Sequence, residues 1–238
     1  MIRAAAMAAC LLLAPVAATA QDCRQALALA LDVSGSVDAR EYRLQLDGVA
    51  RALGSVAVRA RLLEQPEAPV ELLVFEWSGP QDQLTLVPWT RIDSAAALER
   101  VIETLGTVER RADATPGTGL GVAMSVGAQH LAQRAQCVKR TLDISGDGKS
   151  NLGPRPRHVK PLLEPQGITV NALVIGADDA AIGDARQAEI AELVQYFSAE
   201  VILGPEAFVK TALGYDGYAE AMEAKLLREL DVLVLSAR

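Results

Sequence analysis

The chain has 238 residues, of which 50% are hydrophobic and 22% charged, and its formal net charge is −7. A chain of this length and composition can bury one sizeable core, so the sequence predicts a folded protein with a single domain as the default. The negative charge and the lack of any lysine- or arginine-rich run exclude a protein that binds the nucleic-acid backbone.

The first 20 residues have the pattern of a secretory signal peptide. Arg3 supplies a short positive region, an apolar run follows, and the Ala-Thr-Ala sequence at 18–20 suits signal peptidase. Cleavage would leave residues 21–238 as one domain in the periplasm or outside the cell. A lipoprotein anchored at Cys10 is a weaker interpretation, because most of the apolar run follows that cysteine. The run is too short to span a bilayer comfortably, so we expect no membrane insertion after cleavage.

Beyond residue 20, β-type apolar runs alternate with helical patterns. Strands are predicted at 26–33, 70–77, 83–89, 138–145, 168–176 and 199–204. Helices are predicted at 38–54, 93–105, 118–133, 184–196 and 216–231. Several of the strands lack polar alternation, which is typical of strands whose two faces are both covered by helices. The order predicts an α/β fold with a doubly wound, Rossmann-like, mostly parallel central sheet of about six strands.

Two helices carry clear local signals. Asp38 can cap the first helix, and Glu41, three residues later, completes a capping box. The last predicted helix has large side chains at three- and four-residue spacing, which predicts that they pack against the sheet. These side chains are Tyr218, Met222, Leu226, Leu227, Leu230 and Leu233. The Pro- and Gly-rich stretch 151–167 predicts a loop with one short helix inside the domain.

Hydroxyl and carboxylate side chains occur at three expected strand ends or helix starts. Asp32 ends the first predicted strand with Ser34 and Ser36 in the turn after it, Thr118 begins a helix, and Asp147 follows the fourth strand. Ligands of open α/β sheets bind beyond the carboxyl ends of the strands. Oxygen ligands suit a hard cation, and Mg²⁺ takes six of them in near-octahedral geometry. The sequence therefore predicts one metal site built from three loops.

Each of these residues also has an ordinary structural interpretation. The two serines could help to start the first helix, Thr118 could start another, and Asp147 could belong to a simple turn. We favour the metal site because all five residues stand in order at the ends of elements. Asn151 could brace the third loop by hydrogen bonds, and a plain turn role is equally consistent with its position.

The same five residues resemble the metal-ion-dependent adhesion site of von Willebrand factor type A domains, which has a DxSxS loop, then a threonine, then an aspartate. The resemblance implies that Ser34, Ser36 and Thr118 ligate Mg²⁺ through their hydroxyls, while Asp32 and Asp147 act largely through bound waters. Mn²⁺ or Ca²⁺ is the alternative ion. The resemblance also implies that an Asp or Glu of a protein partner occupies the remaining coordination position.

This resemblance covers essentially the whole chain after the signal peptide. The stretches "SGSVDAREY", "EWSGP" and "SGDGKSN" further resemble a subgroup of secreted bacterial proteins that carry this domain and whose role is undefined. The residues Glu76, Trp77 and Trp89 belong to or follow these motifs, and we expect them to pack or pair across neighbouring strands.

Two cysteines, Cys23 and Cys137, remain after the predicted cleavage. An even pair favours a disulfide in an oxidising compartment, and two separate buried thiols are the alternative. The resemblance makes the first and fourth predicted strands parallel neighbours, each with its cysteine at the end opposite to the metal site. It therefore implies a Cys23–Cys137 disulfide that acts as a structural staple.

Enzyme motifs fail at particular residues. A phosphate-binding loop would need glycine where the chain has Asp143, and a dinucleotide fingerprint would need glycine in place of Val122. The histidines, His130 and His158, belong to no nucleophile motif. We expect an exported protein-binding module that is not an enzyme. The alternatives are a metal-independent periplasmic scaffold and a metal-dependent hydrolase that uses the same five oxygen donors.

Overall fold

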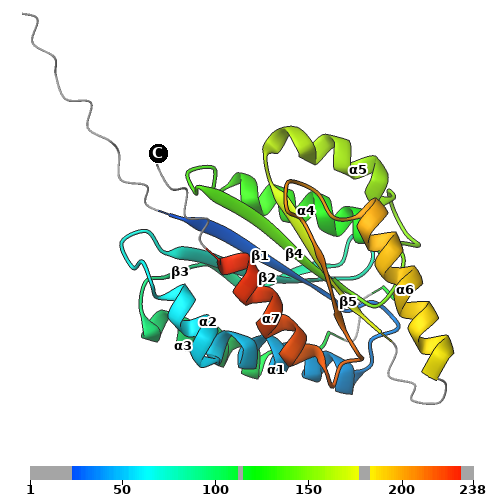
Figure 1. Cartoon of the computed structure of the whole chain (residues 1–238), viewed down its shortest axis with the longest axis horizontal. Helices are drawn as coiled ribbons and strands as arrows, with labels where there is room; N and C mark the ends of the chain where they lie inside the picture. The colour runs from blue at the N-terminus through cyan, green and yellow to red at the C-terminus, as the bar shows by residue number, and fades with distance from the viewer. Residues whose placement is uncertain (1–22, 112–114, 177–182, 232–238) are drawn as a thin grey trace, which may run out of the picture.

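A computed structural model describes residues 23–111, 115–176 and 183–231 of the chain. In this part of the chain, six strands form one sheet in the order β3-β2-β1-β4-β5-β6 (Figure 1). The strands are β1 (Gln25–Asp32), β2 (Val70–Trp77), β3 (Gln83–Ile92), β4 (Lys139–Gly146), β5 (Thr169–Ile175) and β6 (Val209–Ala212). Every neighbouring pair is parallel except β2 and β3. The predicted mostly parallel sheet is confirmed.

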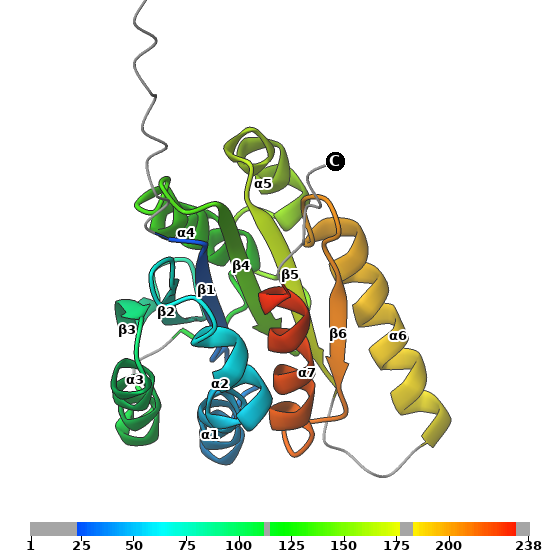
Figure 2. The same ribbon diagram turned by 60° about the vertical axis from the view of Figure 1, so that its left-hand side comes forward.

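Helices cover both faces of this sheet (Figure 2). One layer contains α1 (Ala39–Gly54), α2 (Val56–Leu62), α3 (Ala95–Thr107) and α7 (Tyr218–Leu230). The other contains α4 (Leu120–Ala132), α5 (Pro156–Leu163), the 3₁₀ turn η1 (Glu164–Gln166) and α6 (Gly183–Glu200). Because side chains alternate along a strand, β1 directs leucines into the first core and alanines into the second. The doubly wound arrangement of the prediction is therefore confirmed.

The start of α1 is held by the predicted capping box. The Asp38 carboxylate accepts a hydrogen bond from the Glu41 amide (2.8 Å), and the Glu41 carboxylate accepts one from the Asp38 amide (2.8 Å). These bonds satisfy donors that a helix start would otherwise leave unpaired. The turn 33–37 is consequently held between the end of β1 and a well-defined helix start.

The sequence prediction is wrong about the sixth strand. It assigns a strand to 199–204, but α6 continues to Glu200, and Leu203 forms only an isolated antiparallel bridge with Val170. Val201 is fully buried in the second core, so the apolar run belongs to the end of a helix and the turn after it. The true β6 was not predicted, because only Ala212 of its residues is buried and it has little apolar signal.

A second unpredicted element is the short helix α2. Ser55 follows α1 directly, and its hydroxyl accepts a hydrogen bond from the Val58 amide (3.3 Å). The serine therefore ends α1 and caps α2, and its extended backbone separates the two helices.

Helix α7 confirms the predicted apolar stripe. Tyr218, Met222, Leu226 and Leu230 are buried, Leu227 is partly buried, and Leu233 lies outside the described residues. The helix also buries charges that the pattern of apolar residues does not reveal. Lys225 Nζ lies 2.6 Å from Asp143 Oδ1 of β4 and 2.6 Å from Glu229 Oε1, and all three side chains are inaccessible to solvent. Asn171 of β5 donates a hydrogen bond to Glu229 Oε1 (2.7 Å). This buried network ties α7 to the centre of the sheet.

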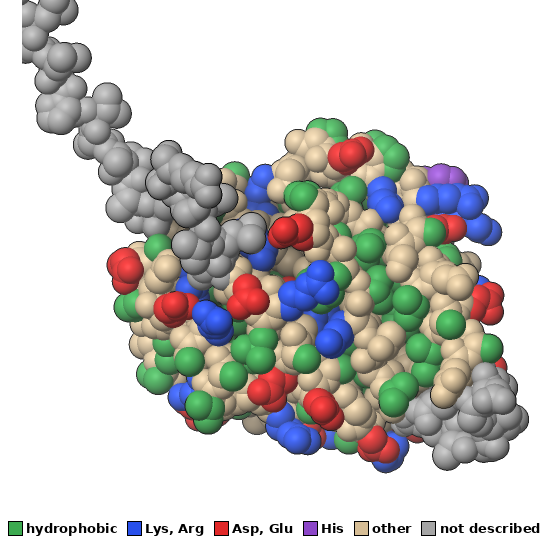
Figure 3. Space-filling view, viewed as in Figure 1, with side chains coloured by type: hydrophobic (Ala, Val, Ile, Leu, Met, Phe, Trp, Pro, Cys, Tyr) green, Lys and Arg blue, Asp and Glu red, His purple; other side chains and the backbone are tan. Residues whose placement is uncertain are grey.

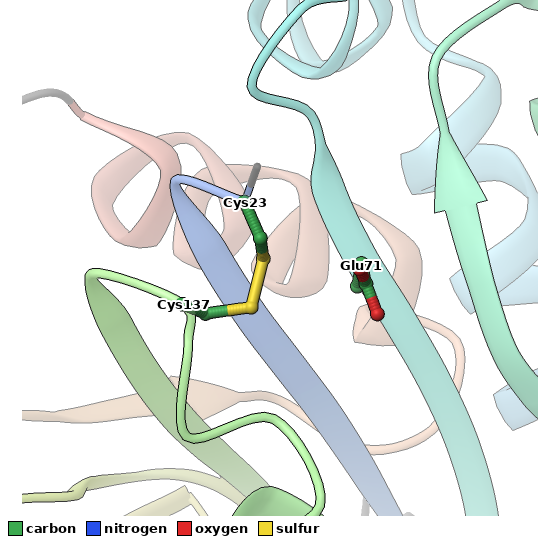
Figure 4. A group of neighbouring side chains, drawn as sticks. All are labelled: Cys23, Glu71 and Cys137. Carbon is green, nitrogen blue, oxygen red and sulfur yellow. A yellow bond between two sulfur atoms is a disulfide. The ribbon is translucent and has the colours of Figure 1, made fainter. Parts of the chain in front are cut away.

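The predicted disulfide is present between Cys23 and Cys137, just before β1 and β4 (Figure 4). These strands are parallel neighbours with Gln25 opposite Lys139, so the bridge lies at the amino ends of both. A Glu71 carboxylate oxygen lies within 4.8 Å of the two sulfur atoms, and that side chain pairs with Arg134. Because thiolates are the form of cysteine that ligates metals, the oxidised pair is a staple and not a metal centre.

Replacing both bridged cysteines by serine is expected to lower the free energy of unfolding by about 2 to 4 kcal/mol. The bridge joins residues separated by 114 positions, so its loss gives the unfolded chain many more conformations. Denaturant titration of the oxidised wild type and the double variant measures the difference. An unchanged midpoint would mean that the bridge does not restrain the unfolded chain.

On the face seen in Figure 3, acidic and basic side chains are scattered among one another. No described helix has the length and hydrophobicity to span a membrane. The predicted signal peptide at 1–20 lies outside the described residues and stays a prediction.

Candidate metal centre

The three predicted loops meet at the carboxyl ends of the central strands. Asp32 ends β1 and Asp147 directly follows β4, and these two strands are parallel neighbours. Thr118 lies two residues before α4, where the Gly119 amide donates a hydrogen bond to the Ser78 carbonyl at the end of β2 (2.7 Å). The fold therefore brings all five predicted residues to one edge of the sheet.

The first and third loops are in direct contact. Ser34 Oγ lies 3.3 Å from Ser36 Oγ, and the Ser36 hydroxyl donates a hydrogen bond to Asp147 Oδ1 (3.0 Å). The Ser34 amide donates to Asp32 Oδ1 (2.8 Å), which holds this carboxylate above the turn. The other oxygen, Asp32 Oδ2, is buried without a hydrogen-bond partner in the described part of the chain.

The second loop is tied to the third through Asn151. The side-chain Oδ1 of Asn151 accepts a hydrogen bond from the Thr118 backbone amide (2.8 Å), and the backbone amide of Asn151 donates one to the Thr118 carbonyl (3.0 Å). A Cβ atom built on Gly148 would lie 4.0 Å from Thr118 Oγ1, so this hydroxyl faces the turn that carries Asp147. Asn151 thus braces two loops at once.

Asp32 is a buried carboxyl group close to a second carboxyl group. Burial, and next the negative charge of Asp147, raise the pKa of Asp32 to about 8. Burial also raises the pKa of Asp147, while hydrogen bonds from Ser36 and Tyr215 oppose that shift. A cation near the two carboxylates would offset both their desolvation and their mutual repulsion.

The residues present fit a hard divalent cation. Three hydroxyls and two carboxylates supply oxygen only, which is the donor that Mg²⁺, Mn²⁺ and Ca²⁺ prefer. The buried and unpartnered Asp32 Oδ2 is an acceptor that needs a positive group or a donor. Ser34 and Thr118 are buried, whereas Ser36 is exposed and Asp147 is half-buried, so the edge is open on one side to an external ligand.

Two further residues, which no sequence motif indicated, hold the site. Gln45 Nε2 of α1 donates a hydrogen bond to the Asp32 carbonyl (2.8 Å), and the Tyr215 hydroxyl donates to Asp147 Oδ2 (3.4 Å). Gln45 is a fully buried polar side chain on the apolar face of its helix, and that position was a usable signal. Tyr215 is 68 residues from Asp147, and no local pattern links them.

The three strand residues expected to pack do so. Glu76 accepts a hydrogen bond from the buried Tyr42 hydroxyl (2.8 Å), and Trp77 is completely buried. The guanidinium of Arg134 lies 5.0 Å from the centre of the Trp89 ring. Glu76 and Trp77 lie at the carboxyl end of β2, beside the metal loops, whereas Trp89 lies near the start of β2 at the other end of the sheet.

Without divalent cations, we expect stability to fall as pH rises from about 4 to about 8. The folded-state pKa of Asp32 is raised from 3.8 to about 8, so the folded protein binds this proton more tightly than the unfolded chain does. The resulting stabilisation is complete below the unfolded pKa and is lost through the folded pKa. Asp143, whose pKa burial and then Glu229 raise to about 7, acts in the same direction.

Thermal melts of the metal-free protein across this pH range measure the effect. Added Mg²⁺ should reduce the loss, because the cation favours ionised Asp32, and Asp32→Asn should flatten the curve. A melting temperature that rises steadily to pH 8 in the metal-free wild type would contradict the raised pKa of the Asp32 carboxyl group.

Comparison with known proteins gives one family match and several structural neighbours. The model of a family described as "Protein of unknown function (DUF1194)" matches residues 22–234. No curated protein matches the chain. Proximal thread matrix protein 1 from the mussel byssus is 18% identical with a TM-score of 0.58, covering 88% of this chain and 48% of its own. The pilus adhesin SpaC from Lactobacillus rhamnosus GG, in its open conformation, is 14% identical with a TM-score of 0.60, covering 87% and 30%.

A third neighbour is the conserved hypothetical protein BatB from Bacteroides thetaiotaomicron. It is 12% identical with a TM-score of 0.55, and the match covers 86% of this chain and 98% of that one. At these identities the neighbours show the fold alone, and it is a von Willebrand factor type A-like fold. The chain spans about half of the mussel protein, one structure of which is described with a zinc-occupied MIDAS motif (21% identical, TM-score 0.56).

Proposed function

For this chain, which belongs to the DUF1194 family of proteins of unknown function, we propose a role as a metal-dependent protein-binding module. The module holds a divalent cation at the edge formed by β1, β4 and the start of α4. The observation that carries the proposal is Asp32 Oδ2, a buried carboxylate oxygen without a partner in the described chain, beside Asp147 and the linked hydroxyl groups of Ser34 and Ser36.

The five residues of the site contribute to ion binding in two ways. Ser34, Ser36 and Thr118 supply hydroxyl oxygens, and Asp32 and Asp147 supply negative charge largely through bound waters. A bound cation offers an electrophilic position to an oxygen from outside the chain. Because few carboxylates contact the ion directly, a carboxylate from a partner is a favoured ligand there. The partner is therefore a protein that presents Asp or Glu.

Mg²⁺ is the ion we expect, with Mn²⁺ and Ca²⁺ as alternatives. The zinc-occupied motif of the mussel protein adds Zn²⁺ to the ions worth testing. The place of action is the periplasm or the exterior of the cell, since the Cys23–Cys137 disulfide is the type of bond that persists in oxidising compartments. We propose that the site binds a partner and does not catalyse a reaction.

Calorimetry and thermal melts test this function directly. The mature chain, stripped with EDTA, is titrated with MgCl₂, MnCl₂, CaCl₂ and ZnCl₂. A cation that binds only the folded state stabilises it by about 2.7 kcal/mol at a concentration 100 times its Kd. Absence of both heat and melt shift for all four ions in a folded protein would favour the metal-independent scaffold.

Affinity capture from periplasmic extract, with and without EDTA, then tests partner binding. We expect captured proteins that EDTA releases. Turnover of phosphate-ester or peptide substrates that depends on the same cation would instead favour the hydrolase.

A further inference from the structure

A groove adjoins the candidate metal centre. Its volume is about 240 Å³, and the turn after β4, the end of β5 and one side of α6 form its walls. Asp147, one of the five metal-site residues, is part of its lining. Pockets that enclose small molecules usually measure about 300 to 1,000 Å³, so this one is better suited to a single long side chain.

The groove combines apolar side chains of α6 with charged side chains, of which three are acidic and one, Lys149, is basic. The apolar side chains of its lining come from α6, where Ile190 is half-buried and Leu193 is nearly buried, whereas the Ile175 side chain packs in the first core on the other face of the sheet. Glu189 and Glu192 stand one helical turn apart on α6 and are both exposed. A lysine or arginine side chain has the matching chemistry, because its aliphatic stem packs on apolar atoms while its charged end stays at the rim.

The charges of the rim are not balanced within the described chain. Glu192 forms an ion pair with Lys149, whose ammonium also lies 6.0 Å from the centre of the Tyr196 ring. Glu189 lines the same groove, and in the described ranges it has no ion-pair partner. At the metal centre, a divalent cation would balance Asp32 and Asp147. The charge of Glu189 is then left for a cationic group from outside.

We infer that this groove receives a lysine or arginine of the same partner whose acidic residue binds at the metal centre. The inference rests on the proposed function and adds to it the second half of the recognition. Because Asp147 belongs to both sites, the acidic and the basic group of the partner lie close together in space, within the reach of a few residues of extended chain. The partner surface is therefore zwitterionic and not simply acidic.

An immobilised peptide array tests the inference. Each heptapeptide has a central Asp in a Gly/Ser background, and Lys, Arg or norleucine is placed at each of the other six positions. Arrays are probed with the full mature chain in MgCl₂, and in EDTA as the blank. The variants are Glu189→Gln and Glu189→Gln/Glu192→Gln. Glu103→Gln is the matched control, because Glu103 is exposed on α3, which packs at the far side of the sheet from α6 (Figure 2).

We expect wild type and Glu103→Gln to bind Lys or Arg peptides about two- to fivefold better than norleucine peptides at one or more positions, the range of an exposed ion pair. In Glu189→Gln this preference should disappear while Mg²⁺-dependent binding of the Asp peptides persists. Melting temperatures of the variants should match wild type, since both glutamates are exposed.

The negative outcomes of this experiment distinguish a failure of the groove inference from a failure of the proposed function. Mg²⁺-dependent binding of Asp peptides with no preference for Lys or Arg would overturn the groove inference and leave the metal-dependent function standing. A preference for Lys or Arg that survives in Glu189→Gln/Glu192→Gln would place the basic residue elsewhere and also overturn it. No peptide binding above the EDTA blank, combined with no calorimetric response to cations, would overturn both proposals.

Discussion

Asp32→Asn is expected to abolish binding of divalent cations while the protein remains folded. The asparagine keeps the size of the side chain and an oxygen that can accept the hydrogen bond from the Ser34 amide. It removes the negative charge at the buried oxygen that has no partner in the described chain. Titration calorimetry with MgCl₂ measures the loss. In EDTA near pH 8 the variant should melt no lower than wild type, because it no longer ionises a buried group beside Asp147.

Asp47→Asn is the matched control for this substitution. Asp47 is an exposed aspartate of α1 that pairs with Arg43, so the control removes one exposed negative charge that belongs to none of the three metal loops. It should bind cations as wild type does. Ser36→Ala provides a second, milder test, because Ser36 is exposed and its hydroxyl contacts Asp147. Wild-type Mg²⁺ affinity in Asp32→Asn and in Ser36→Ala would refute the assigned centre.

Lys225→Met should lower the free energy of unfolding by about 3 to 5 kcal/mol. The lysine is fully buried between Asp143 and Glu229, and its removal leaves two carboxyl groups without their shared counter-charge. Methionine retains most of the apolar volume, so the loss reports the charge and not a cavity. Denaturant unfolding followed by circular dichroism measures it. We also expect the loss to be smaller at low pH, where protonation of the carboxyl groups removes the unpaired charge.

Two variants separate this effect from a general sensitivity to mutation. Lys210→Met, at an exposed position of β6, should change stability by less than about 0.5 kcal/mol. The triple variant Lys225→Met/Asp143→Asn/Glu229→Gln should recover much of the lost stability, because neutral side chains in place of the buried ions remove the unpaired charges. If Lys225→Met were as stable as wild type, the buried charge network would make no net contribution to the free energy of unfolding.

The buried network is part of a longer polar row along one face of β4. Asp143 pairs with Lys225, Ser145 shares a hydrogen bond with the Tyr218 hydroxyl (2.9 Å), and Asp147 accepts one from Tyr215 (3.4 Å). The spacing of two along the strand places Asp143 and Ser145 on the same face of β4, and Asp147 follows directly after the strand. Helix α7 and the turn before it are therefore aligned on the sheet by specific polar contacts, and the last of these contacts reaches the metal centre.

Local patterns in the chain were sufficient for four of the six strands of the described chain and for the order of the residues that we propose as metal ligands. Continuous apolar runs predicted β1, β2, β4 and β5 to within one or two residues, since fully buried strands show their burial in composition. The order of Asp32, the two serines, Thr118 and Asp147 was readable because carboxyl ends of parallel strands must share one edge. The capping box at Asp38 depends on residues three apart and was equally visible.

Other features depend on residues that meet only after folding. β6 is short, and neighbouring β5 supplies its hydrogen bonds, so its own residues carry little signal. The pairing of Lys225 with Asp143, and of Tyr215 with Asp147, joins residues far apart in the chain that no local period relates. The acidic groove exists only because α6 packs beside the ends of β4 and β5. Burial and alternation leave a trace in a linear sequence, whereas long-range electrostatic pairing has none until packing brings the partners together.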